Sequence, residues 1–507
     1  MMQHLIVFPV VLPLIAGILM LYQRQGLVRY KRTVSVAATL LLLLVAIGLV
    51  RQAASGDVTY YALGDWQAPF GIVLVLDRLS ALMVLLTATL AVGAVVFACA
   101  GDDEKGSNFH GLFQWQLLGI NGAFLTGDLF NLFVFFEVLL LASYALLLHG
   151  GGKARIQASV HYVVLNLAGS SLFLIAVGIL YGATGTLNMA DMAIRVADLP
   201  VEREGLVTAG ALMLLVVFAL KSAMLPLYFW LPKAYASAPA PVAALFAIMT
   251  KVGVYAILRV YSLIFGDSAG DLEALEQPWV WWLSLATIAA AGAGVMAARD
   301  LRLLVAYLVL VSVGTLLAGI GIGTPQAISA LLYYLIHTTL ITGGLFLLAE
   351  MIGLQRGKAG TRLVKGRPMV QGTALGILFF AGAIAVAGMP PLSGAIGKAL
   401  MLNSAEGTQR LWLWPLLLVA GLCSMVALAR AGSTLFWRSY RGNISGSPLP
   451  YRQWFGVIWL LSAAPLLVAL AGPVSSYTQA TAEQLANPQV LIRTLLPDQA
   501  TDAGEAQ

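Results

Sequence analysis

The amino-acid sequence predicts an all-α polytopic membrane protein with about fourteen transmembrane helices. Of the 507 residues, 60% are hydrophobic and only 10% are charged, whereas soluble domains carry about 25% charged residues. Apolar runs of roughly 20 residues recur along the chain, and each is long enough to cross the hydrocarbon core of a bilayer. The formal net charge of +6 is therefore interpreted as a topology signal and not as a nucleic-acid-binding surface.

Fourteen apolar segments follow one another along the chain. The seventh continues past Pro226 to about residue 235, and the twelfth continues past Pro390 and Pro391 to about residue 402, so both are predicted to be broken helices. From about residue 473 onward the sequence predicts a polar tail. The fourteen segments begin near residues 4, 34, 79, 111, 129, 160, 205, 241, 279, 303, 327, 372, 411 and 454.

The connections between these segments differ in their content of basic residues. Those that follow odd-numbered segments hold eighteen Lys and Arg residues, whereas the opposite side holds six. Because basic loops usually face the cytoplasm, both termini are predicted to lie outside. Arg259 and Arg430 fall close to helix ends, and we expect them to reach the lipid headgroups. The six basic residues of the outer side are Arg51, Arg78, Arg195, Arg203, Arg410 and Arg493.

The sequence carries no motif for a cofactor or a metal ion. Cys99 and Cys423 stand singly in apolar stretches, without a CxxC pair or a Cys/His cluster, so no iron–sulfur or zinc site is expected. No Gly-rich nucleotide-binding motif is present between a strand and a helix. We therefore expect neither a cofactor nor a metal in this chain.

Four ionisable residues interrupt the apolar segments: Glu137, Lys221, Lys251 and Lys398. None has an opposite charge three or four residues away on its own helix, although a charge at the bilayer centre costs about 2.5–3.5 kcal/mol. Ion pairs that fix helix packing are one explanation. Because three lysines share one glutamate, they cannot all be charged and directly paired. At least one is expected to release its proton, which would make it a proton carrier with Glu137 as a switch.

Two of these lysines lie at the predicted helix breaks. Lys221 precedes Pro226, and Lys398 follows Pro390 and Pro391. Proline frees a backbone carbonyl, which is tolerated at membrane depth only where protein or water satisfies it. Broken helices in the two halves of a transporter often mark the ion path, and a simple packing kink is the alternative. We predict two five-helix inverted repeats, formed by segments four to eight and nine to thirteen. The predicted units are residues 1–100, 101–265, 266–440, 441–472 and the tail at 473–507.

Further polar residues are candidates for supporting roles. His337 lies between the lysines of the two halves, and imidazole titrates near neutral pH, so a relay is predicted, with packing as the alternative. Tyr255 and Tyr333 could support that relay. His161 is a candidate for proton uptake, although an interfacial position is the favoured interpretation. Asp128 is expected to cap a helix, and a cation site is the alternative.

Three long motifs surround the buried charges: NLFVFFEVLLLASYALL, KSAMLPLYFWLPKAYASAPAPVAALFAIMTKVGVYAILR and GMPPLSGAIGKALML. With them the chain resembles the antiporter-like membrane subunits that respiratory complex I shares with the multisubunit Mrp-type cation/proton antiporters. Within that superfamily it most resembles the D subunits of Mrp-type antiporters, which the segment YALGDWQAPFGIVLVLDRLSALMV also fits. The resemblance covers nearly the whole chain up to about residue 470.

The resemblance implies specific roles for five residues. Family members use a central hydrophilic axis for proton transfer, and its positions match Glu137, Lys221, Lys251, His337 and Lys398. Many relatives carry another lysine about one turn beyond the histidine, where this chain has Ile341, Thr342 and Gly343. That link would then depend on water held by Thr342 or by nearby hydroxyl groups.

The resemblance also implies the setting in which the protein works. It would be a secondary-transporter subunit and not an enzyme, assembled with different membrane subunits in the bacterial inner membrane. The complex would exchange Na⁺, or alternatively Li⁺ or K⁺, for H⁺ without a redox cofactor. One alternative is a proton-pumping subunit of complex I or of a membrane-bound hydrogenase, which the companion subunits would reveal. Another is a scaffold whose buried charges only lock helix packing.

Overall fold

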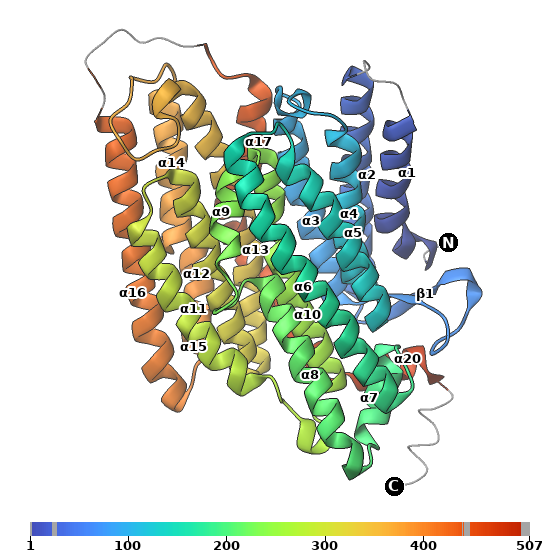
Figure 1. The fold of residues 1–507 in the computed structure, drawn as a ribbon. Coiled ribbons are helices and arrows are strands. Elements are labelled where there is room, and N and C mark those ends of the chain that lie inside the picture. The colour runs from blue at the N-terminus through green and yellow to red at the C-terminus, as the bar shows by residue number, and fades with distance from the viewer. Residues whose placement is uncertain (1–2, 23–27, 439, 441–446, 498–507) are drawn as a thin grey trace.

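The computed structural model describes residues 3–22, 28–438, 440 and 447–497 (Figure 1). These residues form a bundle of α-helices with one small hairpin, so the predicted all-α polytopic class is confirmed. Twelve of the described helices are long and apolar enough to cross a membrane. Two further helices, α4 (Phe109–Leu125) and α14 (Gly372–Ala387), have only 17 and 16 residues. The predicted number of fourteen transmembrane helices therefore stays a prediction.

The N-terminal part contains three long helices and the hairpin. Strand β2 has the sequence VLVL, and all four of its residues are buried. Asp77 then starts α3 with a capping box, because its carboxylate accepts the Ser80 N–H at 2.8 Å and its own N–H donates to the Ser80 hydroxyl at 2.9 Å. The elements are η1 (Gln3–Val7), α1 (Phe8–Tyr22), α2 (Val28–Ala53), β1 (Thr59–Ala62), η2 (Leu63–Asp65), β2 (Val73–Leu76), α3 (Arg78–Ala98) and η3 (Asp102–Glu104).

The first half of the bundle contains one broken helix. Helix α8 (Val201–Ser222) ends where Ala223 adopts a φ of +62°, and α9 (Trp230–Ser237) begins beyond Pro226. A left-handed residue ends a helix, and proline has no amide hydrogen with which to continue it. The remaining helices of this half are α4, α5 (Leu129–Leu148), α6 (Lys153–Thr184), α7 (Met189–Ala197) and α10 (Ala240–Ile264).

The second half of the bundle also contains a broken helix. Helix α14 ends at Gly388, which has a φ of +81°, and α15 (Ser393–Ser404) begins after Pro390 and Pro391. Helix α13 (Pro325–Arg356) runs through the middle of the bundle and packs against both α10 and α15 (Figure 1). The other elements are η4 (Gly270–Leu272), α11 (Gln277–Ala297), α12 (Leu301–Ile322), η5 (Gly357–Ala359), α16 (Gly407–Gly432) and the π-helical turn η6 (Ser433–Trp437).

The C-terminal region is more ordered than a polar tail would be. After α17 (Tyr451–Leu461) and α18 (Ala463–Ala469), the chain forms α19 (Ala471–Ala486) and α20 (Gln489–Leu495). Helix α19 packs against α13 and buries Thr478, Ala482 and Leu485. These residues share one helical face while the opposite face is polar, so hydropathy averaged over the segment does not reveal the buried side.

The first and last described elements lie at the same end of the bundle. The ring of His4 in η1 lies 5.7 Å from that of Tyr61 in the hairpin. Leu491 of α20 lines one small cavity together with Val75 of β2 and Met189 of α7. Helices α7 and α20 are at the lower end of the bundle in Figure 1. The placement of both termini outside stays a prediction.

Candidate functional site

Glu137 and Lys221 are linked through side chains of a third helix. Glu137 of α5 is half-buried and accepts a hydrogen bond from the hydroxyl of Ser170 on α6. The Lys221 ammonium of α8 donates to Asn166 Oδ1, also on α6, at 3.3 Å. Ser170 Oγ lies 3.0 Å from the Asn166 carbonyl oxygen as well. One hydroxyl proton can serve only one of its two acceptors at a time, so Ser170 can switch between the carboxylate and the backbone.

The linking residues of α6 were not predicted from the sequence. Asn166 and Ser170 stand four residues apart, which places them on one face of a helix. Tyr162 occupies the same face and is fully buried, with its hydroxyl 2.8 Å from that of Ser143. A stripe of polar residues at a spacing of four within an apolar helix is the signal that could have identified them.

Lys251 is the most isolated of the buried charges. It is 0% exposed in the middle of α10, and its Nζ has no hydrogen-bond partner within the described ranges. The adjacent Thr250 hydroxyl is also buried without a partner there. The end of α8 packs tightly on this helix at Gly253, where an added Cβ would lie 2.5 Å from the Ser222 nitrogen. Two lysine-bearing helices therefore meet here at close range.

His337 of α13 contacts the broken helix of the second half. Its Nδ1 lies 2.8 Å from the hydroxyl of Ser393, the first residue of α15, and its Nε2 is buried without a partner in the part of the chain that the structure describes. A Cβ on Gly394 would lie 2.9 Å from Nε2 and 1.9 Å from the Ala385 carbonyl oxygen. Only a glycine therefore allows α14, α15 and His337 to meet here.

Substituting Gly394 by alanine is expected to disrupt this junction. The added methyl group cannot avoid the Ala385 carbonyl oxygen. That oxygen is a backbone atom, and a Cβ is bonded directly to the backbone of residue 394, so neither can rotate away. Overpacking of this kind costs about 1–3 kcal/mol. We expect Gly394→Ala to lower the thermal midpoint of the protein. Gly178→Ala is the matched control, since Gly178 is also helical but has open space around it. Equal stability of the two variants would contradict the close junction.

Lys398 lies at the break itself and is held by backbone carbonyls. Its Nζ donates to the carbonyl oxygen of Ala387 at 2.7 Å and approaches that of Val386 at 3.5 Å. Both carbonyls belong to the last turn of α14, where the helix break leaves them without amide partners and the helix dipole is negative. Lys398 thus has partial negative charge around its ammonium but no ion pair with a carboxylate in the described chain.

The tyrosine and threonine candidates donate hydrogen bonds to backbone carbonyl oxygens. Tyr255 donates to the Phe124 carbonyl oxygen at 2.7 Å, and Tyr333 donates to that of Leu467 at 3.1 Å. Thr342 donates to the carbonyl oxygen of Thr338, one turn earlier, at 2.6 Å. These side chains therefore belong to α10 and α13, the helices that carry Lys251 and His337. None of them contacts a lysine ammonium among the hydrogen bonds of the described residues.

Asp128 caps a helix, as the sequence favours, whereas the interfacial position of His161 stays a prediction. His161 is exposed, and its Nδ1 lies 3.3 Å from the Gln157 carbonyl oxygen. Asp128 is the N-cap of α5 and accepts the Asn131 N–H at 2.7 Å. Burial raises the pKa of Asp128 above its usual value despite these N–H contacts. Within the described residues, Asp128 does not belong to a group of three potential metal ligands.

Arg259 corrects one expectation from the sequence. Instead of reaching the headgroups, it is buried and forms a bidentate ion pair with Asp77. Its Nη1 and Nη2 atoms lie 2.6 and 2.8 Å from the two carboxylate oxygens. Its Nε also donates to the Tyr255 hydroxyl at 3.1 Å. The capping aspartate at the start of α3 reaches α10 directly, so a local partner inside the bundle replaces the distant headgroups. Arg430 contacts the Met296 carbonyl oxygen and stays exposed.

A second unexpected cluster joins Cys99, Asp103 and His110. One ligand-type atom from each lies within 4.8 Å of the others, an arrangement that the sequence analysis did not predict. Arg32 Nε lies 2.6 Å from Asp103. Burial acts to raise the pKa of Asp103, but the hydrogen bonds from Arg32 and His110 lower it to about 2. The carboxylate is therefore ionised and engaged by Arg32 at neutral pH.

The sequence as a whole is similar to those of known antiporter subunits. It is 42% identical, over 96% of each chain, to a protein of Rhizobium meliloti that is named as the D subunit of a probable K⁺/H⁺ antiporter. It is 36% identical to the D subunit of a Na⁺/H⁺ antiporter of Bacillus subtilis, over 98% of this chain and 100% of the relative.

Two solved complexes contain chains of the same fold. A chain of the Mrp complex from Dietzia superposes with a TM-score of 0.87 at 25% identity, covering 98% of this chain and 99% of the other. A chain of respiratory complex I from Thermus thermophilus gives 0.79 at 26% identity, covering 95% and 99%. Residues 126–425 also match the family described as "NADH:quinone oxidoreductase/Mrp antiporter, TM". The chain therefore belongs to the NADH:quinone oxidoreductase/Mrp antiporter family.

Proposed function

We propose that this protein is the proton-translocating D subunit of a hetero-oligomeric antiporter that exchanges H⁺ for a monovalent cation. One observation carries the proposal. Lys221, Lys251 and Lys398 are at most 8% exposed, yet none forms an ion pair with a carboxylate among the described residues. Buried ammonium groups without full compensation favour the neutral amine. Each such amine can accept a proton and pass it on.

The proposed path runs through Glu137, Lys221, Lys251, His337 and Lys398. Glu137 acts as the switch at the first lysine. When it is ionised, its negative charge favours the protonated form of Lys221, with Asn166 and Ser170 between the two groups. When it is neutralised, that support is lost and Lys221 can release its proton toward Lys251.

Internal water is proposed to complete the path between the two halves. Lys251 Nζ, Thr250 Oγ1, His337 Nε2 and Thr338 Oγ1 are buried polar atoms without partners in the described part of the protein. Such atoms are where buried water binds, provided that two or more polar groups converge. Thr342 donates its proton back to its own helix, so its oxygen can still accept a hydrogen bond from water in the link that lacks the relatives' additional lysine.

The proposed membrane setting is supported by the distribution of charge and by the relatives. The basic connections lie at the end of the bundle opposite the hairpin, where Arg302 donates to the Ala238 carbonyl oxygen and Arg452 to that of Cys99. This end is proposed to be cytoplasmic and both termini to be outside. The bacterial relatives support a place in the inner membrane. Their names differ in the cation, so Na⁺, K⁺ and Li⁺ all need testing.

The companion subunits distinguish the two transport alternatives. Purification of the tagged protein in mild detergent is expected to recover other antiporter subunits, and vesicles with the recovered complex are expected to exchange H⁺ for Na⁺ or K⁺. Recovery of iron–sulfur or quinone-binding subunits would instead favour a pump of the complex I or hydrogenase type, which the likeness to complex I keeps open.

Replacing Lys221 by arginine is expected to stop transport while the complex still assembles. A guanidinium group stays protonated at any physiological pH and cannot hand its proton on. Proton transport by Lys221→Arg in vesicles should fall by at least about 100-fold, the scale of losing a proton-transfer group. Lys358→Arg, on an exposed turn, is the control. A variant that assembles and keeps wild-type rates would exclude Lys221 as a proton carrier.

A further inference from the structure

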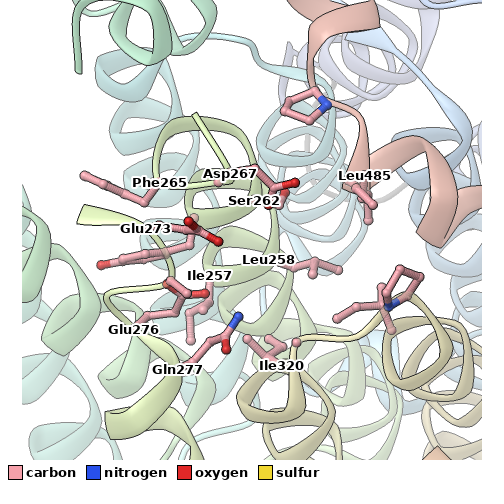
Figure 2. A pocket seen from close by; sticks show the side chains of 18 of the residues that line it. Ile257, Leu258, Ser262, Phe265, Asp267, Glu273, Glu276, Gln277, Ile320 and Leu485 are labelled. Atoms are coloured by element: carbon pink, nitrogen blue, oxygen red, sulfur yellow. The ribbon is translucent and has the colours of Figure 1, made fainter. Parts of the chain in front are cut away.

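An acidic cavity opens at the end of the bundle that carries the hairpin and α20. Its volume is about 270 Å³, far above the roughly 10–15 Å³ that one water molecule needs. The wall is formed by the end of α10, the start of α11 and the C-terminal helix α19. Asp267, Glu273 and Glu276 line it together, as Figure 2 shows. No lysine, arginine or histidine is among the described residues that line this cavity.

Glu276 is the buried carboxylate of this cavity. It is only 6% exposed, and its Oε2 atom has no hydrogen-bond partner in the described chain. Asp267 and Glu273 are exposed at the rim. A buried carboxylate oxygen without a donor is costly unless something compensates it. The cavity thus presents one deep carboxyl group with an unsatisfied oxygen beneath two exposed carboxylates.

Six helix ends meet at this cavity. Helices α10, α12 and α19 all end at the cavity, with Phe265, Gly323 and Ala486 in its wall. The C-terminal end of a helix carries partial negative charge from its free carbonyls. Three helix N-termini face the same space, those of α11, α13 and α20, whose N-cap Pro488 is in the wall, and the start of α13 is already capped by Thr324. With three helix ends of each sign the backbone dipoles roughly cancel, so the negative charge of the cavity comes from its carboxylates.

We propose that this cavity binds a hard metal cation, an alkali or alkaline-earth ion, with Glu276 as the buried ligand and Asp267 and Glu273 at the mouth. Carboxylate, amide and carbonyl oxygens are the ligands that such cations prefer, and Gln277 adds an amide oxygen to the wall. The site is separate from the proposed proton path, because none of its residues belongs to that path. Helix α10 connects the two, since it carries Lys251 in its middle and Ile257 in the cavity wall.

Carbodiimide labelling of the intact complex tests this site directly. A hydrophobic carbodiimide modifies accessible carboxyl groups, and mass spectrometry identifies the modified residue. In choline chloride we expect Glu276 to be labelled. Replacing choline with Na⁺, K⁺ or Ca²⁺ at constant ionic strength should protect it, and the separate titrations identify which class of cation binds. Equal labelling in all four salts, or no labelling of Glu276 at all, would overturn the proposal.

Variants at the mouth show whether protection comes from binding in this cavity. Removing two carboxylates by Asp267→Asn with Glu273→Gln should raise the half-protecting cation concentration about tenfold, as expected for two charges acting at a few ångströms in a polar medium. Asp198→Asn removes an exposed carboxylate at the same end of the bundle but outside the cavity, and it should leave the titration unchanged. The same shift in both variants would mean general charge screening. Such a result would reject the site without affecting the proposed proton path.

Discussion

The Lys251→Met variant is expected to be inactive and more stable than the wild type. Methionine fills a similar volume and needs no hydrogen bonds, whereas the buried Nζ of Lys251 has none within the described residues. An unsatisfied buried donor costs about 1–3 kcal/mol, so its removal should raise the free energy of unfolding by an amount of this order. Transport should fall by at least about 100-fold, because the variant lacks the proposed proton carrier.

The opposite signs of the two effects make this variant informative. A lysine that only locked helix packing would lose stability when replaced, whereas a lysine kept for transport costs stability in the wild type. Thermal denaturation of the purified complex and proton transport in vesicles are the two measurements. Lys358→Met, on an exposed turn, should change neither. A destabilised Lys251→Met complex that still transports would support the scaffold interpretation.

Breaking the ion pair between Asp77 and Arg259 should produce the largest loss of stability. Both side chains are buried and joined by two short contacts, and removal of one partner of a buried pair costs about 3–5 kcal/mol. Asp77→Ser keeps a capping side chain for α3 but leaves Arg259 unpaired. Arg259→Met leaves Asp77 unpaired. Each variant should strongly lower the thermal midpoint of the complex.

The double variant separates the pair from its surroundings. When both charges are removed, no unpaired charge stays buried, and a well-packed apolar replacement is often close to neutral. Asp77→Ser with Arg259→Met should therefore recover most of the stability lost in the single variants. Asp57→Ala, on an exposed loop, is the control for the same end of the molecule. If the double variant instead lost as much stability as the two single variants together, a direct ion pair would be contradicted.

The sequence predicted the features that are costly in a membrane. Apolar runs identified the fold class, and the charges at Glu137, Lys221, Lys251 and Lys398 stood out because hydrocarbon penalises them. The structure adds how they are held. Lys398, for example, lies against backbone carbonyls at 2.7 and 3.5 Å, and this contact depends on the exact direction of the chain after α14.

Other features could not be predicted because they depend on which helices become neighbours. Asn166 and Ser170 are polar residues of a kind common in membrane helices, and only the packing of α5, α6 and α8 gives them a role. Arg259 meets Asp77 across 182 residues of sequence. Cys99 joins His110 only because a turn brings α3 and α4 together. Hydropathy and short-range spacing contain no information about such contacts.

The ionisation state of the buried lysines is the most direct test of the proposed transport mechanism. Magic-angle spinning NMR of the complex in lipid, with lysine labelled at the side-chain ¹⁵N, distinguishes a neutral amine from an ammonium group. At neutral pH we expect at least one neutral amine signal, which should disappear in Lys221→Met, Lys251→Met or Lys398→Met. Detection of only ammonium signals for all three lysines at neutral and mildly alkaline pH would contradict a proton path through them.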